Sequence, residues 1–404
     1  MTRFTQLFAC LIAALCTQAA FAQVGAEPAN TTVPSTSTAP VAYVYVSTAT
    51  SGEPNRVWAF AAAPDARLTV VKGSPFTANV VSMAVTGKYL FGTNTNGTDV
   101  DSFSIAPDGA LKQAASINAL SYTGQNCNGL GPLILDHTGA SLYVEASVGG
   151  LCGHSEYLSF TIDKSTGELK FLGSTAQTFL FNSPLSFLAN NAFAYGTDCI
   201  NFQGNYLDTF AGLRREGTGL LTYVNVSLPT PAAKNSGDVY CRDLTAADPS
   251  GHLAVSMQAI SGDSTPDGAP QLAAYTADKS GNLTTKSTFE NMPTAKVLAM
   301  STLAMSPSGK LLAVAGAEGL EVFHFNGSNP ITHYTGVLNN HNFSPVSPSP
   351  GLMFWDSSNH LYAITPGGDQ KLRAFTVTPS SASEAAGSPY SAGGVRTIAV
   401  LPRD

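Results

Sequence analysis

The sequence predicts an all-β fold of the propeller class, with seven blades of four antiparallel strands around a central channel. Three observations lead to this prediction. A short apolar strand recurs seven times at intervals of 45 to 60 residues, an aromatic residue follows each copy, and turn-forming sequences separate the strands. Repeated units of this length with four short strands are typical of propeller blades, whereas helical repeats need a 3.6-residue period that we do not find.

The two markers of the repeat are independent of each other. The apolar strand occupies residues 44–46, 89–91, 142–144, 193–195, 253–255, 312–314 and 361–363. The aromatic residues that follow are Phe60, Phe103, Phe160, Phe210, Tyr275, Phe323 and Phe375. Gly, Asn and Asp stand before the first marker and after the second, where they suit tight hairpin turns. Because each marker occurs seven times, we expect seven blades.

The two ends of the chain complement each other. Residues 396–400 resemble the innermost strand of other units, such as residues 82–85, but lack the strand that should follow. Residues 42–46 supply that missing second strand. We therefore expect one blade to contain strands from both termini. This pairing closes the ring and leaves no open sheet edge between the first and last blades.

The N-terminal segment predicts export. The first 22 residues carry one positive charge at Arg3, an apolar run and a small-residue cleavage site before Gln23, as in a cleaved secretory signal. Residues 23–41, rich in Thr, Ser, Pro and Ala, predict a disordered leader, and residues 42–404 predict the propeller. No later segment has the apolar length needed to span a bilayer. We expect a secreted or periplasmic protein without a membrane span in its mature chain.

Composition limits the function. The chain has 20 basic and 27 acidic residues, a net charge of -7 and no basic cluster, which argues against nucleic acid as a partner. Charged residues make up only 12% of the sequence, which argues against a coiled coil or a charged disordered protein. We expect a globular monomer whose partner is a protein, a glycan or a small polar ligand.

Four cysteines remain after removal of the signal, and an even number in an exported chain favours disulfides. Cys127 and Cys152 lie in two loops of the third blade that emerge on the same face. Cys199 and Cys241 lie in loops of the fourth and fifth blades on that face. We predict the pairs Cys127–Cys152 and Cys199–Cys241. The wide spacing and the lack of a C-x-x-C motif argue against zinc, and we predict no metal site.

Long insertions are expected on one face of the ring, named the long-loop face. They comprise residues 47–56, 120–131, 148–156, 198–206, 261–270 and 339–350, whereas the opposite face has tight turns. Because long loops often carry function, we expect a binding site on the long-loop face.

The candidate ligand-binding residues near the channel mouth are Arg56, Asp99, His154, Asp198, Arg242, His341 and Arg396. Arg242 and Arg396 are expected directly before inner strands, and the others on nearby loops. A mixed ring of such side chains suits a polar or anionic ligand. A solvated loop surface with local ion pairs is the alternative.

Three segments carry a family resemblance. Residues 303–314 (LAMSPSGKLLAV) and 244–255 (LTAADPSGHLAV), with the turn DKSTGEL at 163–169, resemble repeats of the lactonase-like and YVTN-type propellers of secreted bacterial proteins. The resemblance implies a seven-bladed propeller and, for the enzymes of the lactonase family, hydrolysis of a lactone. Those enzymes also resemble one another in a Pro-His segment followed by an acidic residue, and no predicted blade of this chain begins with Pro-His.

No catalytic motif indicates a reaction. A GxSxG elbow, an HExxH motif, a P-loop and a dinucleotide-binding fingerprint are absent from the sequence, so we predict no catalytic residue and no cofactor. We predict a non-enzymatic binding or interaction module that uses the long-loop face. The alternative is a lactonase-like hydrolase with its acid and base at the channel mouth, because a propeller fold is compatible with both.

Overall fold

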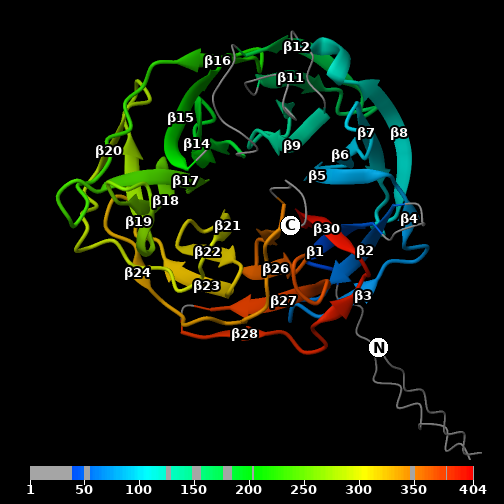
Figure 1. Ribbon diagram of the computed structural model, residues 1–404. Coiled ribbons are helices and arrows are strands. Elements are labelled where there is room, and N and C mark those ends of the chain that lie inside the picture. The colour runs from blue at the N-terminus through cyan, green and yellow to red at the C-terminus, as the bar shows by residue number, and fades with distance from the viewer. Residues whose placement is uncertain are drawn as a thin grey trace, which may run out of the picture. The chain divides into compact units, whose positions relative to one another are not determined.

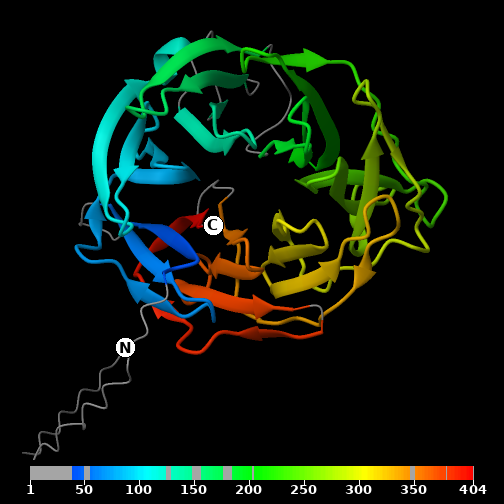
Figure 2. The same ribbon diagram turned by 180° about the vertical axis from the view of Figure 1, so that it is seen from behind.

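Seven antiparallel sheets form a ring around a central channel, and Figures 1 and 2 show this ring from its two faces. The computed structural model describes residues 39–49, 55–123, 129–147, 156–175, 184–202, 204–345, 351–378 and 380–403. The predicted signal, residues 1–22, and most of the predicted leader, residues 23–41, lie outside the described residues. Among the residues that are described, no helix has the length and hydrophobicity needed to cross a membrane.

Each sheet begins with an inner strand at the channel and continues outwards. The inner strands are β5 (Val80–Thr86), β9 (Gly129–Leu135), β13 (Ser186–Phe187), β17 (Val239–Ala247), β21 (Met300–Met305), β25 (Met353–Trp355) and β30 (Val395–Pro402). The second strands are β1 (Ala42–Thr48), β6 (Tyr89–Asn94), β10 (Ser141–Ser147), β14 (Phe193–Phe202), β18 (His252–Ile260), β22 (Leu311–Gly316) and β26 (His360–Ile364).

Third and outer strands complete each sheet. The third strands are β2 (Arg56–Ala62), β7 (Asp99–Ile105), β11 (Glu156–Ile162), β15 (Asn205–Arg215), β19 (Pro266–Ala277), β23 (Gly319–His324) and β27 (Lys371–Val377). The outer strands are β3 (Leu68–Val70), β8 (Leu111–Asn118), β12 (Leu169–Ser174), β16 (Leu221–Val224), β20 (Leu283–Thr285), β24 (Thr332–His333) and β28 (Ala382–Glu384). Two short strands, β4 (Phe76–Thr77) and β29 (Tyr390–Ser391), add to β2 and β27, and a 3-10 helix η1 (Leu120–Tyr122) precedes β9.

The seven-bladed prediction is confirmed. Blade 1 contains β30, β1, β2 and β3, and blades 2 to 7 start in chain order with β5, β9, β13, β17, β21 and β25. Every predicted apolar strand lies within a second strand, and every predicted aromatic residue lies within a third strand. The periodic sequence markers therefore correspond to fixed places in each blade.

Both ends of the chain contribute to blade 1, as predicted. Strand β1 pairs antiparallel with β2 on one edge and with β30 on the other. In the second pairing Val44 lies opposite Val400, and Val46 lies opposite Ile398. Figure 1 shows β30, in red, beside β1, in blue. The ring is closed by main-chain hydrogen bonds between segments at opposite ends of the sequence.

The hydrophobic core consists of layers between neighbouring blades. One layer packs Phe91 of blade 2 against Val144 and Phe160 of blade 3, and another packs Leu272 of blade 5 against Phe323 of blade 6. A second strand has a neighbouring blade on both of its faces, so every residue of β1 and β22 is buried. This explains why these strands are continuous apolar runs rather than alternating ones. Burial of each large side chain contributes about 1.5–3 kcal/mol.

A repeated hydrogen bond fixes successive blades to each other. The hydroxyl of a tyrosine on a second strand donates to a main-chain carbonyl in the turn that precedes the outer strand of the next blade. These bonds join Tyr45 to Gly109 (3.1 Å), Tyr89 to Ser165 (2.7 Å), Tyr143 to Gly219 (2.8 Å) and Tyr195 to Gly281 (2.7 Å). Burial raises the pKa of Tyr195 above its usual range, so this hydroxyl keeps its proton and remains a donor.

The same turns approach the preceding blade so closely that they require glycine. Gly281 has a φ of +86°, and a Cβ at this position would lie 2.6 Å from the ring of Phe193. Gly251, in a turn at the same end of the molecule, has a φ of +99° but nothing within 4 Å of such a Cβ. The two positions share the left-handed backbone, and only Gly281 also needs the space.

We expect Gly281→Ala to destabilise the protein more than Gly251→Ala. Both substitutions strain the backbone by about 1 kcal/mol, and the overlap with Phe193 adds about 1–3 kcal/mol at Gly281 alone. Urea unfolding of the two variants measures the difference. Equal losses of stability would contradict the claim that close contact between blades fixes this turn.

Candidate functional site

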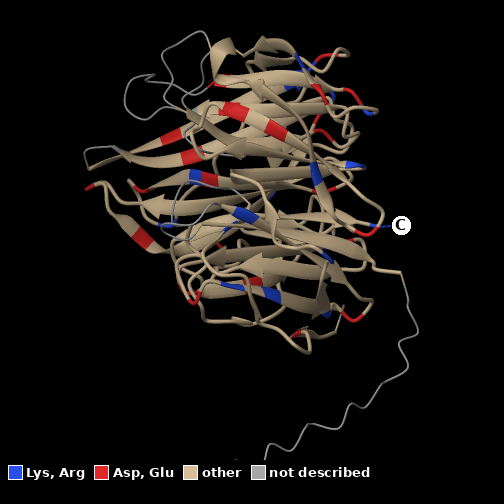
Figure 3. Ribbon diagram, turned by 90° about the vertical axis from the view of Figure 1, so that its right-hand side faces the viewer, with Lys and Arg blue, Asp and Glu red and all other residues tan. Residues whose placement is uncertain are grey.

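The strand order places one set of connections at each end of the channel. Inner and third strands begin, and second strands end, at the long-loop face, whereas the short turns lie at the other end. The hairpins of blades 4 and 5 are longer than the others, since β14, β15, β18 and β19 contain 10, 11, 9 and 12 residues. In Figure 3 strands project on the side opposite the labelled C terminus.

These long hairpins correct part of the loop prediction. Residues 198–206 and 261–270 were expected to be loops, but β14 continues to Phe202, β15 begins at Asn205 and β19 begins at Pro266. Continued pairing satisfies the main-chain N–H and C=O groups that an open loop would leave to solvent. Asp198 therefore lies on a strand with a fixed direction, not on a loop.

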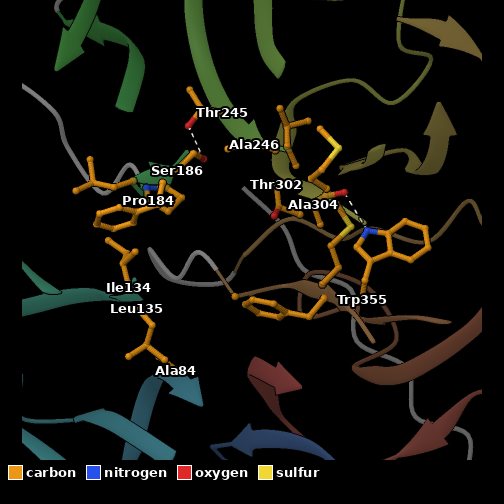
Figure 4. A pocket seen from close by; sticks show the side chains of 18 of the residues that line it. Ala84, Ile134, Leu135, Pro184, Ser186, Thr245, Ala246, Thr302, Ala304 and Trp355 are labelled. Carbon is orange, nitrogen blue, oxygen red and sulfur yellow. Dashed lines mark hydrogen bonds between the residues drawn. The ribbon is translucent and has the colours of Figure 1, made fainter. Parts of the chain in front are cut away.

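The channel contains a cavity of about 610 Å³ that is lined by residues from all seven inner strands (Figure 4). Its walls are mainly Ala, Val, Leu, Ile, Met, Phe and Trp, with a few Ser and Thr hydroxyls. Among the described lining residues only His137 and Asp248 have ionisable side chains. The His137 ring is hydrogen-bonded to the Phe187 carbonyl oxygen, and the Asp248 carboxylate accepts bonds from Ser250 and His252. The described wall therefore offers an apolar surface without a free charge.

Four inner strands share the sequence pattern Ser/Thr-x-Ala beside this cavity. The hydroxyl residues are Ser82, Thr245, Thr302 and Thr397, and all four are buried. Three of the hydroxyls connect neighbouring blades: Ser82 Oγ accepts from Leu133 N (3.2 Å), Thr245 Oγ1 donates to Ser186 Oγ (2.9 Å), and Thr397 Oγ1 donates to Gly351 O (3.2 Å). The side chain of Thr302 lines the cavity.

A second group of polar side chains lies at the long-loop end of blades 4 and 5. The predicted disulfide Cys199–Cys241 is confirmed, and it joins β14 to β17 with a Cα–Cα distance of 5.4 Å. Beside the disulfide, burial and the neighbouring Asp198 carboxylate raise the pKa of Asp243 to about 7. A hydrogen bond from the Cys199 main chain has the opposite, smaller effect. A carboxyl with this pKa can take up or release a proton near neutral pH. Neither aspartate lines the channel cavity.

The described candidate ligand residues come from several blades. Cys127, Cys152 and His154 lie outside the described residues, so the first predicted disulfide has no structural outcome. The six described candidates all lie at the long-loop end of their blades, and none lines the cavity. Arg56 is exposed at the start of β2, and Asp99, at the start of β7, accepts a hydrogen bond from Asn94 (2.9 Å).

The two arginines expected directly before inner strands lie within them, in β17 and β30. Arg242 binds both carboxylate oxygens of Asp208, donates to the Leu228 carbonyl and lies over the Phe210 ring at 5.6 Å. Its guanidinium is used to hold blade 5 against blade 4. Arg396 is half-buried and has no ion pair with another described residue.

His341 belongs to a small polar group in blades 6 and 7. Its Nδ1 lies 3.9 Å from Asp369, whose carboxylate also binds the buried Arg373. Burial opposes ionisation of Asp369, but a hydrogen bond from Thr365 and the neighbouring charge of Arg373 lower its pKa. The carboxylate is therefore ionised near neutral pH and neutralises the buried arginine.

Two features of the site were missed at the sequence level. The repeated Ser/Thr-x-Ala pattern was a detectable signal for the channel wall, since it recurs in four units. No sequence pattern marks Asp243, because its raised pKa depends on burial and on Asp198, which belongs to another blade.

Comparison with known proteins supports the fold. No family model matches the sequence, and no curated protein matches it significantly. A periplasmic gluconolactonase from Pseudomonas aeruginosa aligns with a TM-score of 0.59 and 13% identity, over 89% of this chain and 99% of its own. A functionally unknown protein from Desulfotomaculum acetoxidans aligns with a TM-score of 0.59 and 13% identity, and the alignment covers 90% of this chain and 99% of that protein. A hypothetical selenium-binding protein from Sulfolobus tokodaii aligns with a TM-score of 0.57 and 9% identity, and the alignment covers 90% of this chain and 94% of that protein. At such identities the likeness establishes a propeller fold and no activity.

The raised pKa of Asp243 predicts a pH-dependent stability. The folded protein holds this proton up to about pH 7, whereas the unfolded chain releases it near pH 4, so stability falls as the pH rises between these values. Asp243→Asn should therefore raise the free energy of unfolding by about 1–3 kcal/mol at pH 8 and hardly at all at pH 4. Asp263→Asn, at an exposed carboxylate whose pKa is lowered, is the control and should give no gain at pH 8. A pH-independent effect of Asp243→Asn would disprove the pKa assignment.

Proposed function

We propose that the protein is a non-enzymatic binding module that takes a small neutral ligand into its central channel. The observation that carries this proposal is the cavity of about 610 Å³ with its apolar wall. Small-molecule sites are typically concave, about 300–1,000 Å³ in volume, and mostly apolar with a few placed polar groups. The described lining has these properties, because a small number of Ser and Thr residues lie among its apolar side chains.

The chemistry of the channel argues against a charged ligand in it. A phosphorylated or carboxylated molecule would need Arg or Lys to replace its lost hydration, and the described lining contains neither. This makes the channel unlike a site for an anionic sugar lactone.

The cavity wall reaches the short-turn end of the channel at His137, Asp248 and Ser306, so the long-loop end is proposed as a separate contact surface. Arg56, Asp99, Asp198, His341 and Arg396 lie at that end of their strands or on its connections. We propose that they contact a partner protein, a glycan or a second, polar ligand. Arg242 is left out of this set, because its hydrogen bonds are already used within the fold.

A hydrolase is the second candidate, because of Asp243. In this alternative ionised Asp198 accepts a proton from the attacking water, and protonated Asp243 gives a proton to the leaving alkoxide of a lactone. The observation that favours it is the pKa of about 7 beside a second carboxylate.

We propose that the protein acts outside the cytoplasm. The Cys199–Cys241 disulfide supports this location, since structural disulfides form mainly in oxidising compartments. The gluconolactonase of similar fold is periplasmic, which agrees with the same location.

Titration calorimetry with 2-naphthol and a pH-stat assay with glucono-δ-lactone separate the two candidates. We expect 2-naphthol to bind, Ala304→Phe to abolish binding by filling the channel, and Ala114→Phe on the exposed outer strand β8 to leave it unchanged. Ligand at ten times its Kd should also stabilise the protein by about 1.4 kcal/mol. Lactone turnover that Asp243→Asn abolishes would instead support the hydrolase.

A further inference from the structure

The Thr302 hydroxyl differs from the three others of the Ser/Thr-x-Ala pattern. The residue is only 6% exposed, and its hydroxyl has no hydrogen-bond partner among the described residues, although its side chain lines the cavity. The hydroxyl oxygen keeps some exposure to the cavity, where a water molecule or a ligand can bond to it. The polar atom is therefore better suited to a molecule in the channel than to the stability of the blade.

The contacts around Thr302 differ from those around its counterparts. At the other three positions the hydroxyl connects neighbouring blades. Between blades 6 and 7 the indole Nε1 of Trp355 makes that connection, because it donates to the Ala304 carbonyl at 3.0 Å. Figure 4 shows this bond next to Thr302, and the Thr245–Ser186 bond at a separate place on the wall. Among the described residues, the Thr302 hydroxyl takes no part in a connection between blades.

The wall beside Thr302 indicates the rest of the ligand. Strands β21 and β25 contribute Met305, Met353, Phe354 and Trp355 to the cavity lining. Phe354 is 38% exposed, which is unusual for a large aromatic residue, and a ligand in the cavity would cover it. Methionine and aromatic side chains adapt well to flat, polarisable molecules.

Together these features select a narrow class of ligand. One free hydroxyl can donate one hydrogen bond and accept others, so it suits a single hydroxyl or carbonyl group. A sugar would place most of its hydroxyls against Ala, Leu, Met and Phe side chains, where they lose their bonds to water.

We propose that Thr302 is the specificity-determining residue of the channel and that the ligand is a neutral, largely aromatic or alicyclic molecule with one hydroxyl or carbonyl group. This inference rests on the proposed channel function and adds the class of ligand to it. The hydroxyl or carbonyl of the ligand bonds to Thr302 Oγ1, and its apolar body covers Phe354 and the adjoining methionines.

The test compares two probes that differ only in a hydroxyl, 2-naphthol and naphthalene. Binding of each to the mature protein is measured by titration, for the wild type, Thr302→Val, Thr302→Ser and Thr245→Val. In the wild type we expect 2-naphthol to bind about five- to tenfold more tightly than naphthalene, as one hydrogen bond provides. Thr302→Val should remove this preference without changing the affinity for naphthalene, and Thr302→Ser should keep it.

Thr245→Val is the matched control. It removes a hydroxyl that is bonded to Ser186, so it should lower the melting temperature and leave the preference between the probes intact. A preference that persists in Thr302→Val would overturn the assignment of Thr302 while channel binding still stands. If neither probe binds the wild type, the proposed channel function itself is wrong, and the role of Thr302 falls with it.

Discussion

The pairing of β30 with β1 is the constraint on which the rest of the propeller depends. Each blade is held mainly by its two neighbours, so blade 1 must be complete for blades 2 and 7 to keep their packing surfaces. Tyr45 of β1 bonds to the Gly109 turn of blade 2, and Thr397 of β30 bonds to Gly351 at the start of blade 7. The same closure fixes the width of the channel, because the cavity needs all seven inner strands.

Much of the fold was predictable because each blade meets the same physical demands. A second strand buried on both faces must be a continuous apolar run, and a turn packed against an aromatic ring must contain glycine. Residues 312–314 and Gly281 illustrate these two rules, and repetition makes them visible in a single sequence. Closure was predictable for a related reason, since residues 42–46 and 396–400 are incomplete alone and complementary together.

The candidate site was less predictable because its properties arise between blades. Arg242 has the sequence features of a ligand residue, but its partner Asp208 lies 34 residues away on another blade. Asp243 owes its pKa to Asp198 of blade 4. Thr302 and Thr245 share one pattern, and the bond from Thr245 to Ser186 of blade 4 has no equivalent at Thr302 among the described residues. No local pattern encodes such contacts.

Hydrogen exchange of the main-chain amides tests the central role of closure most directly. If β1 and β30 are integral to the ring, their amides exchange only when the whole propeller unfolds, at rates within about tenfold of those in β10 and β18. Exchange of β1 and β30 that is faster by several orders of magnitude would mean that blade 1 opens by itself while the other blades stay folded. In that case the closure would be a local contact, and the ring and its channel would depend on the other blades.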